Sequence, residues 1–249
     1  MANGQPITNE INEIEASLFH KDVTVTRSND LVQSSYFLTL NERRLIECSI
    51  AKIRNGQPIP SVIKVSADEF SEVWGIPKSN AFKELKIATS NLRDRLIKMR
   101  REDLKEDWEI RWVDAIGYQS GQGYVKLSFS QHIRPYLQQL IHGYYTKYRL
   151  AEIKHLNSVH AIRLYELIMQ FRKTGCRTDT VENFREFFGI EGKYPQWGDF
   201  SKWVIKKACA EINKATDYYV YFDVEKKKNK AYRVTFFFHL KDQLSLELQ

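Results

Sequence analysis

Hydrophobic positions along the first half of the chain follow helical and strand spacings in a clear order. They predict a helix over 41–54, a short strand over 62–65, a helix over 66–74, a long helix over 81–99 and a hairpin of strands over 108–118 and 124–129. Ser66 and Glu69 have the spacing of a capping box at the start of the second helix, and Gly75 supplies its stop. Asn80 is the expected cap of the long helix, and a Gly-rich turn over 120–123 joins the hairpin.

The second half repeats this order. The pattern predicts a helix over 159–173, a short strand over 178–180, a helix over 181–188, a longer helix over 200–215 and a hairpin of strands over 218–224 and 231–240. Ser158 is the expected cap of the first of these helices, Gly175 and Gly189 are helix stops, and residues 225–230 form the hairpin turn. The two halves therefore share one plan.

A short motif supports this duplication. The string Val73-Trp74-Gly75-Ile76 returns as Phe187-Phe188-Gly189-Ile190, and Phe70 has its counterpart in Phe184 at the same separation. Helix, short strand, helix, helix and hairpin is the order of a winged helix, which is a helix-turn-helix unit with a hairpin beside it. We expect an α+β chain with two tandem winged-helix domains related by pseudo-two-fold symmetry.

The expected division has three parts. Residues 1–22 are acidic and are expected to form a flexible tail, residues 23–146 an N-terminal winged helix, and residues 147–249 a C-terminal winged helix.

Helical wheels of the two long helices test whether they could enter a DNA groove, because such a helix buries one side and offers polar groups on the other. In the second copy, Phe200, Val204, Ile205, Ala208 and Ile212 share one arc, and Lys202, Lys206, Cys209 and Asn213 lie opposite. In the first copy the expected buried arc is Ala81, Leu85, Ala88, Leu92 and Leu96. Trp197 and Trp203 are expected to pack in the core.

These wheels and the lysine-rich hairpin turn give a set of candidate DNA-binding residues. On the second long helix they are Ser201, Lys202, Lys206, Lys207 and Asn213. On the first they are Lys78, Ser79, Asn80, Lys83, Lys86, Ser90 and Arg93. On the wing they are Lys226, Lys227, Lys228 and Lys230, where charge suits contact with phosphate. The alternative interpretation is that these are solvated faces of ordinary amphipathic helices. The presence of two cationic helices at equivalent places in the two copies favours DNA binding over this alternative.

Composition agrees with this interpretation. The 249 residues carry 38 Lys and Arg against 31 Asp and Glu, a formal net charge of +7, which favours a polyanionic partner. The chain has no apolar run long enough to cross a bilayer and no signal-peptide pattern at its start, so we expect a soluble cytoplasmic protein without membrane contact. Three widely spaced cysteines indicate neither a disulfide framework nor a metal site.

Catalytic patterns are weak, so we expect no enzymatic activity and no cofactor. A rolling-circle nickase needs two metal-binding histidines separated by one residue and a tyrosine nucleophile, whereas His155 and His160 are five apart. The string from Gly189 to Tyr194 has the Gly and Lys of a phosphate loop but lacks its spacing and its Ser or Thr after Lys193.

Three ordered motifs resemble a known family. The first is Ser28-Asn29-Asp30-Leu31-Val32 followed by Leu38-Thr39-Leu40-Asn41-Glu42. The second is Tyr148-Arg149-Leu150 with Leu156-Asn157-Ser158 and Ala161-Ile162-Arg163-Leu164-Tyr165-Glu166-Leu167. The third is Asp199-Phe200 with Ala210-Glu211-Ile212-Asn213. Together they are similar to the initiator replication proteins of theta-replicating, iteron-bearing bacterial plasmids. The resemblance covers residues 23–240, nearly the whole chain.

The resemblance implies a function and partners. A monomer of this family binds directly repeated origin sites (iterons), helps to open an AT-rich region, and recruits the host initiator ATPase and the replicative helicase. A homodimer, formed through the N-terminal winged helix, binds an inverted repeat at the promoter and represses the protein's own gene. The C-terminal domain reads sequence and the N-terminal domain mainly contacts phosphate, so Lys202, Lys206 and Asn213 are the implied readers. Relatives often have arginines where this chain has Ser201-Lys202-Trp203, which leaves the base preference open.

A dedicated transcriptional repressor with the same DNA-binding fold is the alternative function. Two complete units in one chain favour the initiator, because a repressor usually has one unit and forms its palindrome by dimerising.

Overall fold

A computed structural model describes residues 22–54, 57–101, 105–118, 121, 123–138 and 144–242. The first part of the chain contains β1 (Thr24–Ser28), α1 (Asn29–Gln33), α2 (Leu40–Ala51), β2 (Ile63–Ser66), α3 (Ala67–Trp74), α4 (Lys78–Leu92), β3 (Leu96–Arg101), β4 (Glu106–Arg111), β5 (Val113–Tyr118), β6 (Tyr124–Phe129) and α5 (Arg134–Leu137). The second contains β7 (Tyr145–Arg149), α6 (Leu150–Ile153), α7 (Val159–Met169), β8 (Cys176–Thr180), α8 (Val181–Phe187), α9 (Trp197–Phe200), the π-helical turn η1 (Ser201–Ile205), α10 (Lys206–Ala215), β9 (Tyr218–Lys227) and β10 (Lys230–Leu240).

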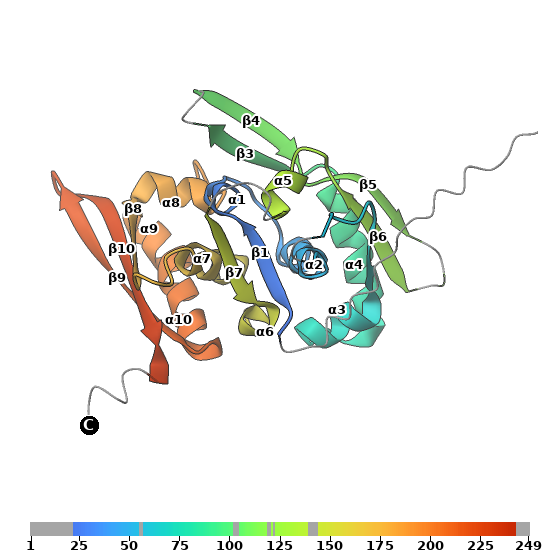
Figure 1. The fold of residues 1–249 in the computed structure, drawn as a ribbon. Helices are drawn as coiled ribbons and strands as arrows, with labels where there is room; N and C mark the ends of the chain where they lie inside the picture. The colour runs from blue at the N-terminus through green and yellow to red at the C-terminus, as the bar shows by residue number, and fades with distance from the viewer. Residues whose placement is uncertain are drawn as a thin grey trace, which may run out of the picture.

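Two winged helices with the same topology make up most of the molecule. Their antiparallel sheets have the orders β2-β6-β5 and β8-β10-β9, so in each copy the short strand pairs with the last strand of the hairpin. The two sheets lie at opposite ends, with α2 and α7 near the centre (Figure 1). The α+β architecture of two tandem winged helices is therefore confirmed.

The local signals that mark the repeat act as the sequence predicts. Ser66 and Glu69 form the capping box of α3, and Thr180 accepts a hydrogen bond from the backbone of Asn183 at the start of α8. Gly75 and Gly189 follow these two helices with φ angles of +65° and +62°. Only glycine adopts this left-handed conformation at low cost, which explains a glycine at both helix ends.

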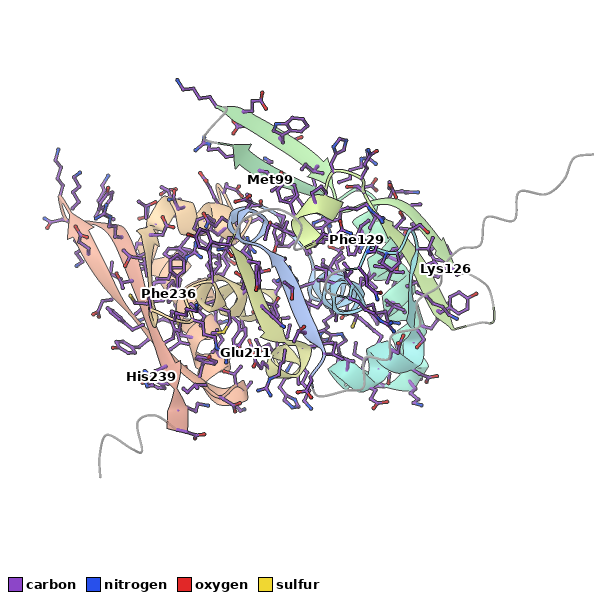
Figure 2. The ribbon with its side chains drawn as sticks, in the orientation of Figure 1. Met99, Lys126, Phe129, Glu211, Phe236 and His239 are labelled. Atoms are coloured by element: carbon purple, nitrogen blue, oxygen red, sulfur yellow. The ribbon has the colours of Figure 1, made fainter. Side chains whose placement is uncertain are left out.

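Buried aromatic side chains fill the interior of both copies. Phe236 of β10 is fully buried and packs edge-on against Phe184 of α8, with ring centroids 5.0 Å apart. Phe129 of β6 is 1% exposed on the other side of the molecule. Figure 2 labels both residues among the side chains between the sheets and the helices. Apolar burial of this kind is the main force that holds each copy together.

The predicted long helix over 81–99 is wrong at both ends. Helix α4 begins at Lys78, with Pro77 and not Asn80 at its N-cap, and ends at Leu92. Residues 96–101 form β3, which pairs with β4 along its whole length. Ile97 and Met99 point into the core at strand spacing, so tertiary pairing overrides the helical pattern there.

The hairpins also differ from prediction. Residues 108–118 do not form one strand, because β4 and β5 belong to different sheets and the fully buried Trp112 separates them. The turn expected over 225–230 is shorter: β9 and β10 are joined by Lys228 and Asn229, both with positive φ, a two-residue turn that matches strand twist. Ser120 and Gln122 of the other predicted turn lie outside the described residues, as does the predicted tail apart from Asp22.

A two-stranded ribbon of β1 and β7 lies between the two winged helices (Figure 1). Thr24 pairs with Arg149 at one end and Ser28 with Tyr145 at the other. The expected boundary between residues 146 and 147 falls inside β7, so this strand belongs structurally to the ribbon.

Buried charges connect this ribbon to both copies. Arg27 of β1 forms ion pairs with Glu47 of α2 at 2.8 Å and with Glu166 of α7 at 2.7 Å. Arg43 of α2 reaches the same two carboxylates at 2.6 and 3.0 Å, and all four side chains are at most 1% exposed. Burial alone would raise the pKa of Glu166, but Arg27, Arg43 and Arg163 lower it to about 2.

A second set of contacts joins the segment after α1 to α7. Arg163 donates hydrogen bonds to the carbonyl of Ser34 at 2.7 Å and to the hydroxyl of Tyr36 at 2.6 Å. Arg44 donates to the side-chain oxygen of Asn157 at 2.8 Å. Breaking these hydrogen bonds would leave donors of buried guanidinium groups without acceptors, so the contacts favour one arrangement of the two copies.

Candidate nucleic-acid interface

The strongest candidate for a DNA-facing element is the continuous helical segment α9–η1–α10. Its buried residues come in neighbouring pairs that return every four positions: Phe200 with Ser201, Val204 with Ile205, and Ala208 with Cys209, followed by Ile212. An ideal α-helix repeats every 3.6 residues, and the π-helical turn η1 supplies the difference. The backbone N–H of Lys206 donates to the carbonyl of Ser201, which is the i to i+5 bond of that turn.

Three predicted lysines lie on the outer side of this helix. All three, Lys202, Lys206 and Lys207, are exposed, the first two as the wheel predicts, and the predicted buried arc is buried throughout. Glu211 of α10 turns the other way and accepts a hydrogen bond from the backbone of Ser158 at the start of α7 (Figure 2). That bond fixes α10 against the start of α7, so the lysine side of the segment faces away from the core.

Two predicted DNA-binding residues of this helix are placed differently. Ser201 is only 6% exposed, and its neighbour in the buried pair is Phe200. Asn213 uses its side chain inside the domain: its amide donates to the carbonyl of Val220 at 2.9 Å and accepts from the N–H of Val220 at 2.6 Å. Cys209, which the wheel places outside, is buried. The wheel fails for Cys209 and Asn213, which follow η1, because it assumes a uniform 3.6-residue turn through that segment. Ser201 falls inside the buried arc even on a uniform wheel, so its burial agrees with the helical period and its selection as a DNA contact was wrong.

Trp203 was expected in the core and is instead 44% exposed. The ammonium groups of Lys202 and Lys207 lie 4.7 and 4.3 Å from the centre of its ring. Trp197, by contrast, packs partly buried against Phe200, with ring centroids 6.0 Å apart. The expectation of core packing is thus wrong for Trp203, and its place on the wheel, between Lys206 and Lys207 and away from the buried arc, is the sequence signal that could have placed it outside.

Helix α4 presents the corresponding surface of the first copy. Ala81, Leu85, Ala88 and Leu92 are buried as predicted, whereas Leu96 lies in β3 and is 39% exposed. The predicted DNA-facing residues Lys78, Ser79, Asn80, Lys83, Lys86 and Arg93 are exposed, and Ser90 is half-buried.

Neighbouring groups make the surface of α4 less cationic than that of α10. Lys78 pairs with Asp68 at 3.2 Å and Arg93 with Asp94 at 3.7 Å, both at exposed positions. The ammonium of Lys86 lies 5.3 Å from the ring centre of Tyr118, and Ile87 is 47% exposed. Exposed ion pairs of this kind are weak, so Lys78 and Arg93 can exchange these partners for phosphate.

The hairpin of the second copy forms a cationic wing. Lys226, Lys227, Lys228 and Lys230 are all exposed at or beside the two-residue turn. Arg233 joins them on β10, is also exposed, and lies 5.3 Å from the ring centre of Tyr232. Arg233 is not among the predicted residues because it lies on the strand, three residues beyond the lysines of the turn.

The described residues offer little for catalysis. They contain no group of three or more His, Cys, Asp or Glu side chains able to hold a metal ion. Burial raises the pKa of both Cys48 and Cys209 to about 12, so both remain thiols at neutral pH. The backbone of Gly189, the first residue of the string that has the Gly and Lys of a phosphate loop, lies against that of Tyr36. No helix in the described part of the chain could span a membrane.

Comparison with known proteins gives a consistent result. The sequence profile described as "Initiator Replication protein, WH1" matches residues 24–169, and that described as "Initiator Rep protein, WH2" matches residues 180–238. Among Escherichia coli relatives, a "Replication initiation protein" is 25% identical over 202 residues, covering 77% of this chain and 62% of the relative, so the chain spans less than two thirds of that protein. The "PI protein" is 26% identical over 245 residues, covering 85% of this chain and 80% of the relative.

A solved structure shows the same fold. The crystal structure of Pi initiator protein in complex with iteron DNA has a TM-score of 0.76 and 24% sequence identity to this chain. The similarity covers 90% of this chain and 99% of the other.

Proposed function

This chain belongs to the initiator replication protein family, and we propose that it starts replication of a bacterial plasmid by binding directly repeated sites in the origin. The observation that carries the proposal is the exposed cationic helix α9–η1–α10 and its lysine wing, in the second of two complete winged helices. A DNA duplex carries a dense array of phosphates, so clustered exposed lysines gain free energy by displacing counterions. The fold shared with a protein bound to iteron DNA supports the same conclusion.

The two copies have different roles in this proposal. Lys202 and Lys206 of the second copy enter the major groove, Lys207 reaches its edge, and the wing contacts phosphate. The first copy contacts mainly phosphate through α4, where Lys83 and Lys86 are the central cations. Asn213 and Ser201 are not included among the readers, because the first is bonded to Val220 and the second is buried.

Regulation and partners complete the proposal. The monomer binds origin repeats and recruits the host initiator ATPase and the replicative helicase in the cytoplasm. A homodimer formed through the N-terminal winged helix binds an inverted repeat at the promoter and represses the gene. The protein acts by binding and has no catalytic activity of its own.

A footprint and a maintenance assay together test this function. The full chain should protect several directly repeated sites, each about two helical turns long, beside an AT-rich stretch near its gene. Supplying the chain should maintain a plasmid that carries only that region. Protection of a single promoter palindrome without plasmid maintenance would identify a dedicated repressor. A site-specific nick in supercoiled origin DNA would identify a nickase.

A further inference from the structure

One exposed aromatic side chain on the DNA-facing helix has no role in a surface that only neutralises phosphate. Trp203 is 44% exposed, and tryptophan is enriched at recognition interfaces because it combines a large apolar ring with one polar N–H. Of the other tryptophans, Trp74 and Trp112 are at most 5% exposed, and Trp197 is partly buried against Phe200. Trp108 is 45% exposed but lies on the separate β3–β4 hairpin, where its ring nitrogen donates to Glu106.

The position of Trp203 suits contact with base edges. The buried pairs that return every four residues leave the pairs Lys202 with Trp203 and Lys206 with Lys207 on the outer side. Trp203 is also in the N-terminal half of the segment that begins at Trp197, and this is the part of a helix-turn-helix recognition helix that meets bases. A side chain at this place therefore faces the groove between the two lysines that flank it.

The chemistry of the indole selects one kind of partner. An apolar ring gains nothing from a phosphate, and the apolar group that base pairs offer in the major groove is the 5-methyl of thymine. Lys202 and Lys207 lie within 4.7 Å of the ring centre, which keeps two cations beside it for the flanking phosphates. We infer that Trp203 is a specificity-determining residue that recognises a thymine methyl group in the major groove.

This inference rests on the proposed function, because it requires sequence-specific binding by this helix. Its test uses the full chain and a duplex that the wild-type protein has selected from a random library of about 22 base pairs, roughly two turns of the double helix. Each thymine of that duplex is replaced in turn by deoxyuracil, which removes only the methyl group. Dissociation constants are measured by fluorescence anisotropy at one fixed salt concentration.

The expected result is a change confined to one or two thymines. Wild-type protein should lose about fourfold in affinity when the contacted methyl is removed, the amount that follows from one buried carbon group. Trp203→Ala should bind the unmodified duplex more weakly and show no further loss at those thymines. Trp203→Phe should still lose some affinity when deoxyuracil replaces those thymines, because phenylalanine retains an apolar ring that can contact the methyl group.

Matched controls separate this role from a structural one. Trp108→Ala removes an equally exposed tryptophan from the other copy and should leave the deoxyuracil profile of wild type unchanged. The inference would be overturned if Trp203→Ala shows the same deoxyuracil-dependent affinity losses as wild type and binds selected and random duplexes more weakly by the same factor. The ring would then serve only to position Lys202 and Lys207. Trp203→Phe is the fallback if Trp203→Ala does not fold. The inference would then be overturned if deoxyuracil has no effect on binding by wild-type protein and Trp203→Phe gives the same affinities across the substituted duplexes as wild type. Failure of wild type to select any sequence would instead refute the proposed function.

Discussion

Gly189 lies so close to the backbone carbonyl of Tyr36 that a Cβ atom at position 189 would overlap it. The residue ends α8 in the second winged helix, whereas Tyr36 belongs to the segment between α1 and α2. The same glycine therefore supplies a left-handed helix stop, with φ of +62°, and a close approach between the two halves.

Gly75 makes this double role testable, because it ends the equivalent helix α3 with φ of +65° and has no atom within 4 Å of an added Cβ. Gly75→Ala should cost only the strain of a left-handed alanine, about 1–2 kcal/mol. Gly189→Ala should cost that and a further ~1–3 kcal/mol from the overlap with Tyr36. Urea unfolding of both variants measures the difference, and equal midpoints would show that the two halves can move apart freely.

The contact between Asn213 and Val220 predicts a loss of stability and not a loss of base reading. Asn213→Ala removes two hydrogen bonds to one backbone unit and should lower the free energy of unfolding by about 1–3 kcal/mol. Its discrimination between selected and random DNA should stay at the wild-type ratio when folded protein is compared. Lys214→Ala, at an exposed position next to it, is the control for stability. If Asn213→Ala changes the ratio of affinities for selected and random DNA while the free energy of unfolding stays the same, Asn213 contacts bases after all.

Lys202 and Lys206 are expected to carry discrimination. The double variant Lys202→Ala with Lys206→Ala should fold normally, because both side chains are exposed, and should lose most of its preference for selected over random duplexes. Each interaction with a base edge that the variant no longer makes is worth about 1–3 kcal/mol. Competition binding measures the ratio, and equal weakening on both duplexes would mean that the two lysines act only on phosphate.

The wing should show the opposite behaviour. Replacing Lys226, Lys227, Lys228 and Lys230 with alanine should weaken binding to every duplex alike. The slope of log K against log salt concentration should flatten by about 0.9 for each phosphate that the variant no longer neutralises. A salt titration on selected and random DNA measures both effects. A slope identical to wild type would place the wing away from the duplex.

Acid should destabilise the protein through Glu166. Its pKa is about 2 in the folded chain and 4.5 as an ordinary glutamate, so the unfolded chain binds the proton first as pH falls. The stabilisation is complete above about pH 4.5 and is lost progressively toward pH 2. Glu166→Gln should cost about 3–5 kcal/mol at neutral pH, because Arg27 and Arg43 remain buried, and should reduce the acid slope. Unfolding curves at several pH values measure this, and an unchanged slope would assign acid sensitivity to other carboxylates.

Local signals made much of the fold predictable. The capping box of Ser66 and Glu69 and the stops at Gly75 and Gly189 depend only on neighbouring residues, and the structure confirms them. Strand β3 was not predictable in this way, because its pairing with β4 and its bridge between Ser35 and Lys98 come from distant segments. The ion pairs around Glu166 could not be foreseen either, since charged residues are rarely buried unless the fold brings partners together.

The outward-facing residues of the candidate site could be predicted only where its helix keeps the 3.6 residues per turn of an ideal α-helix. Lys202 and Lys206 were placed on the outer side because they lie opposite the apolar arc on a uniform wheel. Cys209 and Asn213 were misplaced, because a single π-helical turn shifts every later position relative to an ideal wheel. Trp203 was misplaced for another reason: it was assigned to the core because it is a large aromatic residue, although the wheel puts it on the outer side.

In the segment α9–η1–α10 the buried pairs return every four residues, and this spacing has a consequence for how proteins of this family diversify. Its inward pairs and its outward pairs form two separate sets of positions, so the residues that maintain the fold are distinct from the exposed residues that we propose contact DNA. Substitutions at the outward positions can therefore accumulate without disturbing internal packing. Descendants of one ancestral chain can therefore acquire new target sequences on an unchanged scaffold. This is a physical route by which the initiators of coexisting replicons lose affinity for each other's origins.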